Sequence, residues 1–255
     1  MKIFLAALEH KFYMPQIGMV LSKYLGKVYV LGSYFYLRSG KKSAQYSENL
    51  PTYKDFMLDS GAFSVMVSGV RVPNWDKYIE EYAEYVKEKN VKKFLELDID
   101  SVVGYEEVKR LRGRLEKLAG RQCIPVWHRP RGKAEFLRLC DEYSYIAIGG
   151  VALKYIRSTE YKYLPYLINE AHERKCQIHA LGFTSPSLLE KYHFDSVDSS
   201  SWTSGSRYGA LFKFTNGKLI NIKKEKGYRI SDYNALDAHN LEEWIRFQQY
   251  ADIKF

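Results

Sequence analysis

KKFLELDIDSVVGYEEVKRLRGRLEKLAGRQCIPVWH, residues 92–128, contains two apolar runs separated by an amphipathic stretch. The runs at 92–100 and 123–128 are rich in apolar residues, which is typical of parallel strands that are buried on both faces. Between them, residues 105–119 show the length and polarity of a surface helix. Two parallel strands need a crossover connection of this kind, so the stretch predicts a βαβ unit.

The same alternation runs through most of the chain. Strand-like runs occur at 2–8, 27–37, 56–63, 92–100, 123–128, 145–150, 177–183 and 195–202. Helical patterns occupy 12–25, a segment that begins at Pro73-Asn74, and 105–119, 132–143, 159–175 and 185–192. Eight strands that alternate with helices predict an α/β fold, a (β/α)8 TIM barrel. An open, doubly wound sheet is the main alternative.

The end of the chain has a different pattern. ALFKFTNGKLINIKK (210–224) predicts a hairpin that turns at Asn216-Gly217, and residues 235–250 predict a helix. The polar stretch 38–54 is irregular and makes the second crossover weak. No segment has the composition of a linker, so we expect residues 1–255 to form a single barrel domain with a C-terminal hairpin and helix.

The composition excludes several classes of protein. Of 255 residues, 46% are apolar and 27% are charged, as in ordinary globular proteins. No run of about 18 apolar residues exists, and the N-terminal MKIFLAALEH is too short for a signal sequence. The three cysteines, Cys123, Cys140 and Cys176, are odd in number and scattered, so they predict neither disulfides nor a metal site. We expect a cytoplasmic protein with no membrane partner.

The charge points to a polyanionic partner. The net charge is +9, and ten Lys or Arg residues fall within 105–138, which we call the first basic cluster. A second basic cluster consists of Lys213, Lys218, Lys223, Lys224, Lys226 and Arg229. Basic clusters of this kind favour nucleic acid, although a solvated helix face is an equally good reading of 105–121.

Polar residues gather where the predicted strands end. In a barrel these carboxyl ends form the active-site face. The residues there are Asp59, Asp98, Asp100, Trp127, His128, Gly149, Gly150, His179, Gly182, Asp195 and Asp198. An aspartate after a strand often only caps the next helix, but five on three strand ends favour acid–base or nucleophilic chemistry. No dinucleotide fingerprint or P-loop motif is present.

Several of these segments resemble tRNA-guanine transglycosylases. DSGAFSVMVSG (59–69) is similar to the family's DSGGFQVMSLG, IAIGGVA (146–152) to its IGGLA, and HALGF (179–183) to its LMGVG. FDSVD (194–198) is similar to the FDCV segment that carries the nucleophile, and DAHNLEEW (237–244) to the C-terminal HNL helix. The motifs keep the family's order and cover about residues 55–250.

The resemblance implies a role for each matching residue. Asp195 matches the carboxylate that attacks C1′ of the target nucleotide, Asp59 the general acid/base, and Asp98 the residue that reads the base edge. The Gly149-Gly150 peptide matches the contact to the base carbonyl, and Phe63 and Leu181 match the residues on either side of the base. The remaining candidate substrate-binding residues are Ser60, His128, Asp198 and Trp127, which stands near the family's base-contacting Gln.

The departures from the family narrow the expected activity. The zinc-binding CxCxxC…H set is missing except for His239, so we expect neither zinc nor any other cofactor. A short chain with VDSSSW in the last strand is similar to the phage-type transglycosylases that insert 7-deazaguanine derivatives into DNA. The resemblance therefore implies exchange of guanine in DNA for a 7-deazaguanine base. Alternatives are exchange in tRNA, a barrel glycoside hydrolase, and a barrel that binds nucleic acid without catalysis.

Overall fold

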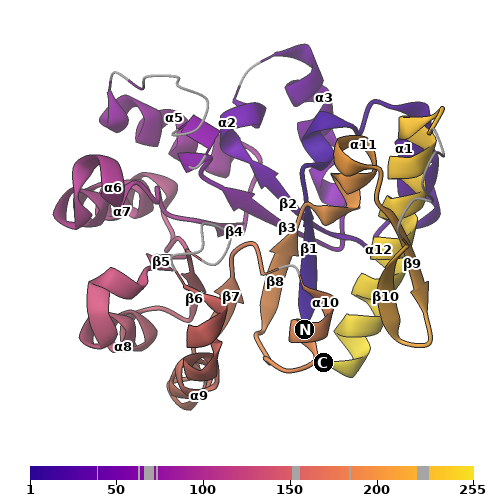
Figure 1. Cartoon of the computed structure of the whole chain (residues 1–255). Coiled ribbons are helices and arrows are strands. Elements are labelled where there is room, and N and C mark those ends of the chain that lie inside the picture. Colours follow the sequence, from indigo (N-terminus) through magenta and orange to yellow (C-terminus); the bar gives the residue numbers. More distant parts are fainter. Residues whose placement is uncertain are drawn as a thin grey trace.

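The computed structural model describes residues 1–38, 40–62, 64–65, 72, 74–150, 156–183, 185–222 and 230–255, and its strands form a barrel surrounded by helices (Figure 1). The eight parallel strands are β1 (Lys2–Ala6), β2 (Tyr29–Ser33), β3 (Asp55–Asp59), β4 (Lys93–Phe94), β5 (Val126–Trp127), β6 (Tyr145–Ile148), β7 (Gln177–Ala180) and β8 (Ser196–Ser199). Each predicted strand is present, and the fold is the predicted (β/α)8 class.

The sheet closes on itself. Its order is β4-β3-β2-β1-β8-β7-β6-β5, so β1 pairs with both β2 and β8. The two outer members are joined by a parallel bridge between Leu95 and Ile124, just beyond β4 and before β5. There the Ile124 N–H donates to the Phe94 carbonyl at 2.7 Å. The predicted alternative, an open sheet, is therefore wrong.

Helices occupy the crossovers. They are α1 (Pro15–Lys23), α2 (Tyr34–Leu37), α3 (Lys41–Glu48), α5 (Trp75–Glu88), α6 (Asp100–Val103), α7 (Tyr105–Ala119), α8 (Gly132–Glu142), α9 (Leu164–Glu173) and α10 (Pro186–Leu189). The Asn74 side chain caps α5 by accepting from the Lys77 N–H at 3.0 Å. Short 3-10 helices precede or follow several of them: η1 (Leu8–His10), η2 (Leu50–Thr52), η3 (Arg129–Arg131) and η4 (Ser158–Tyr163).

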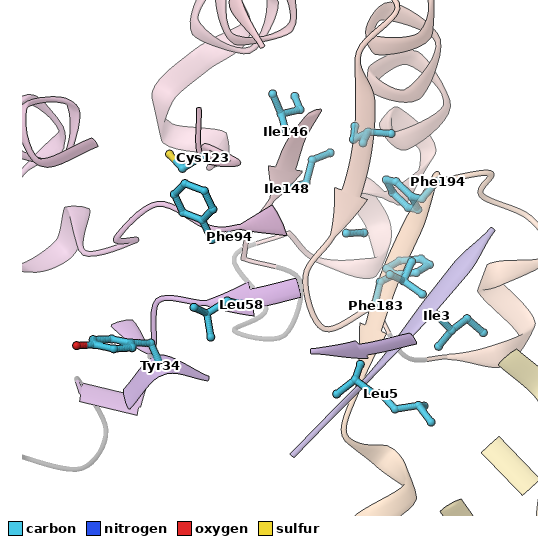
Figure 2. Packing of buried hydrophobic residues seen from close by; sticks show 14 of the residues in the cluster. Ile3, Leu5, Tyr34, Leu58, Phe94, Cys123, Ile146, Ile148, Phe183 and Phe194 are labelled. Atoms are coloured by element: carbon cyan, nitrogen blue, oxygen red, sulfur yellow. The ribbon is translucent and has the colours of Figure 1, made fainter. Parts of the chain in front are cut away.

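Two hydrophobic layers result from the period of two along each strand. Residues that point inward fill the barrel: Phe4, Tyr29, Leu31, Met57, Leu95, Ile124, Val126 and Ala147. Their neighbours, such as Ile3, Leu5, Leu58 and Ile146, point outward and pack under the helices (Figure 2). Full burial of each such side chain contributes about 1.5–3 kcal/mol. This alternation also fixes which strand-end residues face the barrel axis.

The C-terminal part packs along the outside of the barrel, beside α1 and β1. β9 (Leu211–Thr215) and β10 (Lys218–Ile222) form the predicted hairpin, with Asn216 and Gly217 at φ of 51° and 76°, as its turn requires. After η5 (Ser201–Thr203) and α11 (Ser204–Tyr208), the chain ends in α12 (Tyr233–Lys254), which lies beside the hairpin (Figure 1). The Gln248 amide in α12 donates to the carbonyls of Ile3 and Tyr29 and so ties this helix to the barrel.

Some elements differ from the predictions. The strands are shorter than the apolar runs, because a barrel strand needs only a few residues between its two ends. The stretch 38–54, predicted as irregular, contains α3, whose Tyr46 is fully buried against the core. None of the helices in the described ranges is both long enough and apolar enough to cross a membrane.

Candidate active site at the carboxyl end of the barrel

Asp59 ends β3 at the carboxyl mouth of the barrel. It shares its side of the strand with the inward-facing Met57, two residues earlier. Burial raises the pKa of Asp59 to about 7, and the charges of Asp198 and Asp98 act in the same direction, while the Gly61 N–H, 2.9 Å from Oδ2, opposes them. The group can therefore hold a proton near neutral pH and release it without a large free-energy change.

Asp198 brings a second carboxylate to this mouth. It is the register partner of the inward-facing Phe4, so it also points into the barrel. Its Oδ1 accepts from the Gly182 N–H at 2.7 Å and lies 3.4 Å from Nε2 of His179. The other ring nitrogen of His179 is 2.5 Å from the Ser196 hydroxyl. One oxygen of Asp198 is thus fixed by donors, and Oδ2 has no hydrogen-bond partner among the described residues.

Asp98 and His128 form a pair after the neighbouring strands β4 and β5, across the barrel from β8. His128 Nε2 donates to Asp98 Oδ1 at 2.6 Å. Burial alone would lower the pKa of His128, but the hydrogen bond and charge of Asp98 outweigh it, so the pKa is raised. Gly149 lies directly beside this imidazole, since a Cβ there would come within 2.4 Å of His128 Cε1. A glycine at 149 is therefore required for the pair to keep its position.

A buried ionic frame supports that pair. Arg131 donates two hydrogen bonds to Asp100 and a third, of 3.1 Å, to the fully buried Glu96. Glu96 also accepts from the Val126 N–H at 2.8 Å and pairs with Arg112 at 3.2 Å. Because each buried charge has a partner, the frame can hold the segments after β4 and β5 rigid.

One group in the described part of the chain has the donors for a metal ion. Ligand atoms of Asp98, Asp100 and His128 lie within 4.8 Å of one another. However, Arg131 already donates to both oxygens of Asp100 and approaches Asp98 to 4.0 Å. The positive charge that a cation would supply is thus provided by a guanidinium.

Two further polar groups, Glu9 and Ser33, were not expected from the sequence, whereas Ser60 was among the predicted substrate-binding residues. Burial raises the pKa of Glu9, in η1 after β1, to about 7, and the charge of Asp59 contributes. Glu9 Oε2 and the hydroxyls of Ser33 and Ser60 are buried without a hydrogen-bond partner among the described residues. The sequence did carry a signal for Glu9, because a charged residue directly after the apolar run 2–8 stands at the end of a predicted strand.

The placement predicted for Asp195 is wrong. Asp195 precedes β8, and its Oδ2 accepts from the Ile178 N–H at 2.8 Å and from His172 at 3.0 Å. It lies at the amino end, in a cavity of about 290 Å³ that Lys2 and His172 also line. Three strand residues span about 10 Å, so Asp195 and Asp198 belong to different ends of the barrel. The FDSVD segment includes the mouth carboxylate, but as its last residue.

Other predicted site residues vary in position. Trp127 pairs in register with the outward-facing Ile148, and its indole packs on Phe136 of α8. The prediction that Trp127 faces the mouth is therefore wrong. Ser60 is buried after Asp59, and its carbonyl accepts from Tyr78. Leu181 packs against the inner layer after β7.

Gly150, Phe63 and His239 are the remaining positions that the sequence singled out. Gly150 follows Gly149 with φ of 87°, a conformation that suits glycine. Phe63 lies outside the described residues. His239, the remnant of the zinc set, is bonded through Nε2 to the Phe212 carbonyl at 2.9 Å.

Much of the first basic cluster is internally paired. Arg110 binds Asp76 and Glu107, and Arg114 binds Glu80. Arg112 and Arg131 belong to the buried frame described above. In the second cluster Lys213 and Lys218 lie on the hairpin, whereas 223–229 fall outside the described residues. Around Lys133, cations of the first cluster border an open cavity.

The chain was compared with family models, curated proteins and solved structures. No family model matches the chain, and no curated protein does. Among solved structures, the chain is similar to "QR15, an Aldolase", with 14% sequence identity and a TM-score of 0.48 over 78% of this chain and 89% of that one.

Proposed function

We propose that this protein is a transglycosylase that replaces guanine in DNA with a 7-deazaguanine derivative, with Asp198 rather than Asp195 as the nucleophile. The observation that carries the proposal is the electrostatic grouping of Asp59 with Asp198 and Asp98 at one mouth. A carboxyl group whose pKa is about 7 beside an anchored carboxylate is the combination that acid/base and nucleophile require.

The reaction follows the logic of a retaining glycosidase. Asp198 Oδ2 attacks C1′ of the target nucleotide, and the bond from C1′ to the base nitrogen breaks as the ester bond forms. The electron pair of that bond goes to the base, and the Asp59 carboxyl gives its proton to the base. In the second half, the Asp59 carboxylate takes a proton from the incoming base, whose nitrogen attacks C1′ and releases Asp198.

The segments after β4 and β5, across the barrel from Asp198, supply base recognition. Asp98 has one oxygen bonded to His128 and can accept with the other from the N–H groups of a guanine-type base. The Gly149-Gly150 peptide, kept close to His128 by the missing Cβ, is available to a base carbonyl. A base inside a duplex has to be flipped out or presented in a single strand to reach this depth.

A labelling experiment separates the candidate activities. The protein is incubated with labelled guanine or 7-cyano-7-deazaguanine and with DNA or tRNA, and label in each polymer is counted. Label in DNA supports the proposal, and label only in tRNA assigns the tRNA reaction instead. Release of sugar from a polysaccharide, with no label in either nucleic acid, would identify a glycoside hydrolase and overturn the proposal.

A further inference from the structure

A second cavity opens on the same face of the barrel as the mouth. Its volume is about 250 Å³, and its lining includes Trp127 at the end of β5, Arg129 and Lys133 before and at the start of α8, and Tyr163 and Tyr166 around the start of α9. All of these follow a strand and open or precede a helix. Segments of that kind form the active-site face of a barrel, so this cavity is not on the amino end.

The cavity is next to the Asp98–His128 pair along the chain, because Trp127 in its wall directly precedes His128. Trp127 and His128 are consecutive, and consecutive residues leaving a strand point to opposite sides. His128 faces inward to Asp98, whereas the outward-facing indole of Trp127 forms part of the cavity wall. The indole is held there, because its Nε1–H donates to the Gly132 carbonyl at 2.9 Å.

The rim of the cavity combines exposed aromatic rings with cations. Tyr163 is 58% exposed and Tyr166 is 40% exposed, which is high for tyrosines in a fold whose other aromatics are mostly buried. Lys133 Nζ lies 4.7 Å from the centre of the Tyr166 ring, and Lys162 Nζ lies 5.2 Å from that of Tyr163. Arg129 is paired with Glu160, so Lys133 is the lining cation that is open to a ligand, and Lys162 adds a second positive charge beside Tyr163.

We propose that this cavity is a subsite for a nucleotide that neighbours the target nucleotide in the same strand, with its base against Tyr163 or Tyr166 and its phosphate near Lys133. This inference rests on the proposed function and specifies how the polymer is held. Aromatic rings beside lysines are the usual platform for unpaired bases, because any base can stack while the cation attracts the backbone. An apolar small molecule would not need the two lysines.

The test uses oligonucleotides that contain one target guanine and 5-iodo-2′-deoxyuridine at a single varied position. Irradiation of the complex and peptide mapping should locate a crosslink at Tyr163 or Tyr166 for one fixed spacing from the guanine. Crosslinks that never reach these tyrosines at any spacing would overturn the subsite. The measurement depends on binding alone, so it gives a result even with a catalytically silent protein.

Matched variants measure the contribution of the rim. The double variant Tyr163→Ala/Tyr166→Ala should weaken oligonucleotide binding about tenfold, and Lys133→Ala should reduce the slope of log affinity against log salt by about one. The controls are Tyr208→Ala, an 83% exposed tyrosine on α11, and Lys77→Ala, a 71% exposed lysine on α5; both should bind like the parent.

The two proposals can fail separately. If base exchange occurs but the rim variants bind and crosslink like the parent, the subsite is wrong and the proposed function stands. If no nucleic acid is ever modified but the crosslinks map to Tyr163 or Tyr166 and the variants lose affinity, the proposed chemistry falls and the nucleotide subsite remains.

Discussion

The backbone N–H of Gly182 donates a 2.7 Å hydrogen bond to the carboxylate of Asp198, across the gap between β7 and β8. This bond fixes the orientation of the carboxylate through Oδ1 and leaves Oδ2 without a hydrogen-bond partner among the described residues. We predict from this geometry that Asp198 is the carboxylate that attacks C1′.

Asp198→Asn should abolish base exchange, with a loss of several orders of magnitude, because the amide lacks the charge that attacks C1′. A denaturation-stable adduct between protein and nucleic acid should form with the parent and be absent from this variant. Asp195→Asn is the matched control from the other end of the barrel and should still form the adduct. An adduct that depends on Asp195 and not on Asp198 would reverse the assignment.

Adduct formation should slow as the pH rises above about 7, because the acid Asp59 then loses its proton. The native pKa lies above the usual 3.8, so the folded protein binds more protons than the unfolded chain, and stability declines between about pH 4 and 7. Asp59→Asn should therefore melt at a higher temperature than the parent at pH 8, with the difference shrinking toward pH 5.

Glu9→Gln is a control for that pH dependence. It removes another buried carboxyl group whose pKa is about 7, so the melting temperature at pH 8 should rise in the same direction. The alkaline fall in adduct formation should persist, because Asp59 is intact. Loss of that fall in Glu9→Gln, with retention in Asp59→Asn, would identify Glu9 as the proton donor.

The sequence was sufficient for the fold because buried parallel strands leave near-continuous apolar runs, as in 92–100 and 177–183. It also placed Asp59, Asp98 and His128 correctly at the mouth, since each ends such a run. It did not separate Asp195 from Asp198. The difference depends on where β8 begins and on which side each residue faces, and a short strand with polar residues carries little signal for either.

Contacts between residues that are distant in the sequence could not be predicted either. The positions of Trp127 and His128 are adjacent, and only the pairing of β5 with β6 shows that one faces outward. The first basic cluster looked like a free positive surface, yet Arg110 and Arg112 are paired with acids from other segments. Charge counts along a chain do not show such pairing.

Arg112→Met should destabilise the fold by about 3 kcal/mol, near the lower end for a broken buried pair. Glu96 keeps Arg131 and the Val126 N–H, so it is not left wholly unpaired. Chemical denaturation measures the change. The control Arg110→Met lies on the same helix but removes an exposed pair, and its effect should be clearly smaller. Equal losses would show that the buried frame has no special role.

Purified protein should contain no stoichiometric zinc, and a chelator should leave base exchange unchanged. The three cysteines are buried, and they lie on other segments than His239. The Nε2 atom of His239 is already bonded to the Phe212 carbonyl. Arg131 supplies the positive charge at the Asp98, Asp100 and His128 group. One tightly held metal ion per chain by elemental analysis would contradict this prediction.

Asp98→Asn should change which base is accepted rather than stop the chemistry. A carboxylate accepts from the N–H groups of a guanine-type base, whereas an amide presents a donor to part of the same edge. His128 also loses the partner that raises its pKa, so its titration, followed by NMR, should move to lower pH. Competition between labelled guanine and other bases measures the selectivity, and Asp100→Asn, which removes a carboxylate not bonded to His128, is the control. If Asp98→Asn keeps the parent's preference while the His128 titration shifts, Asp98 positions the imidazole and does not read the base.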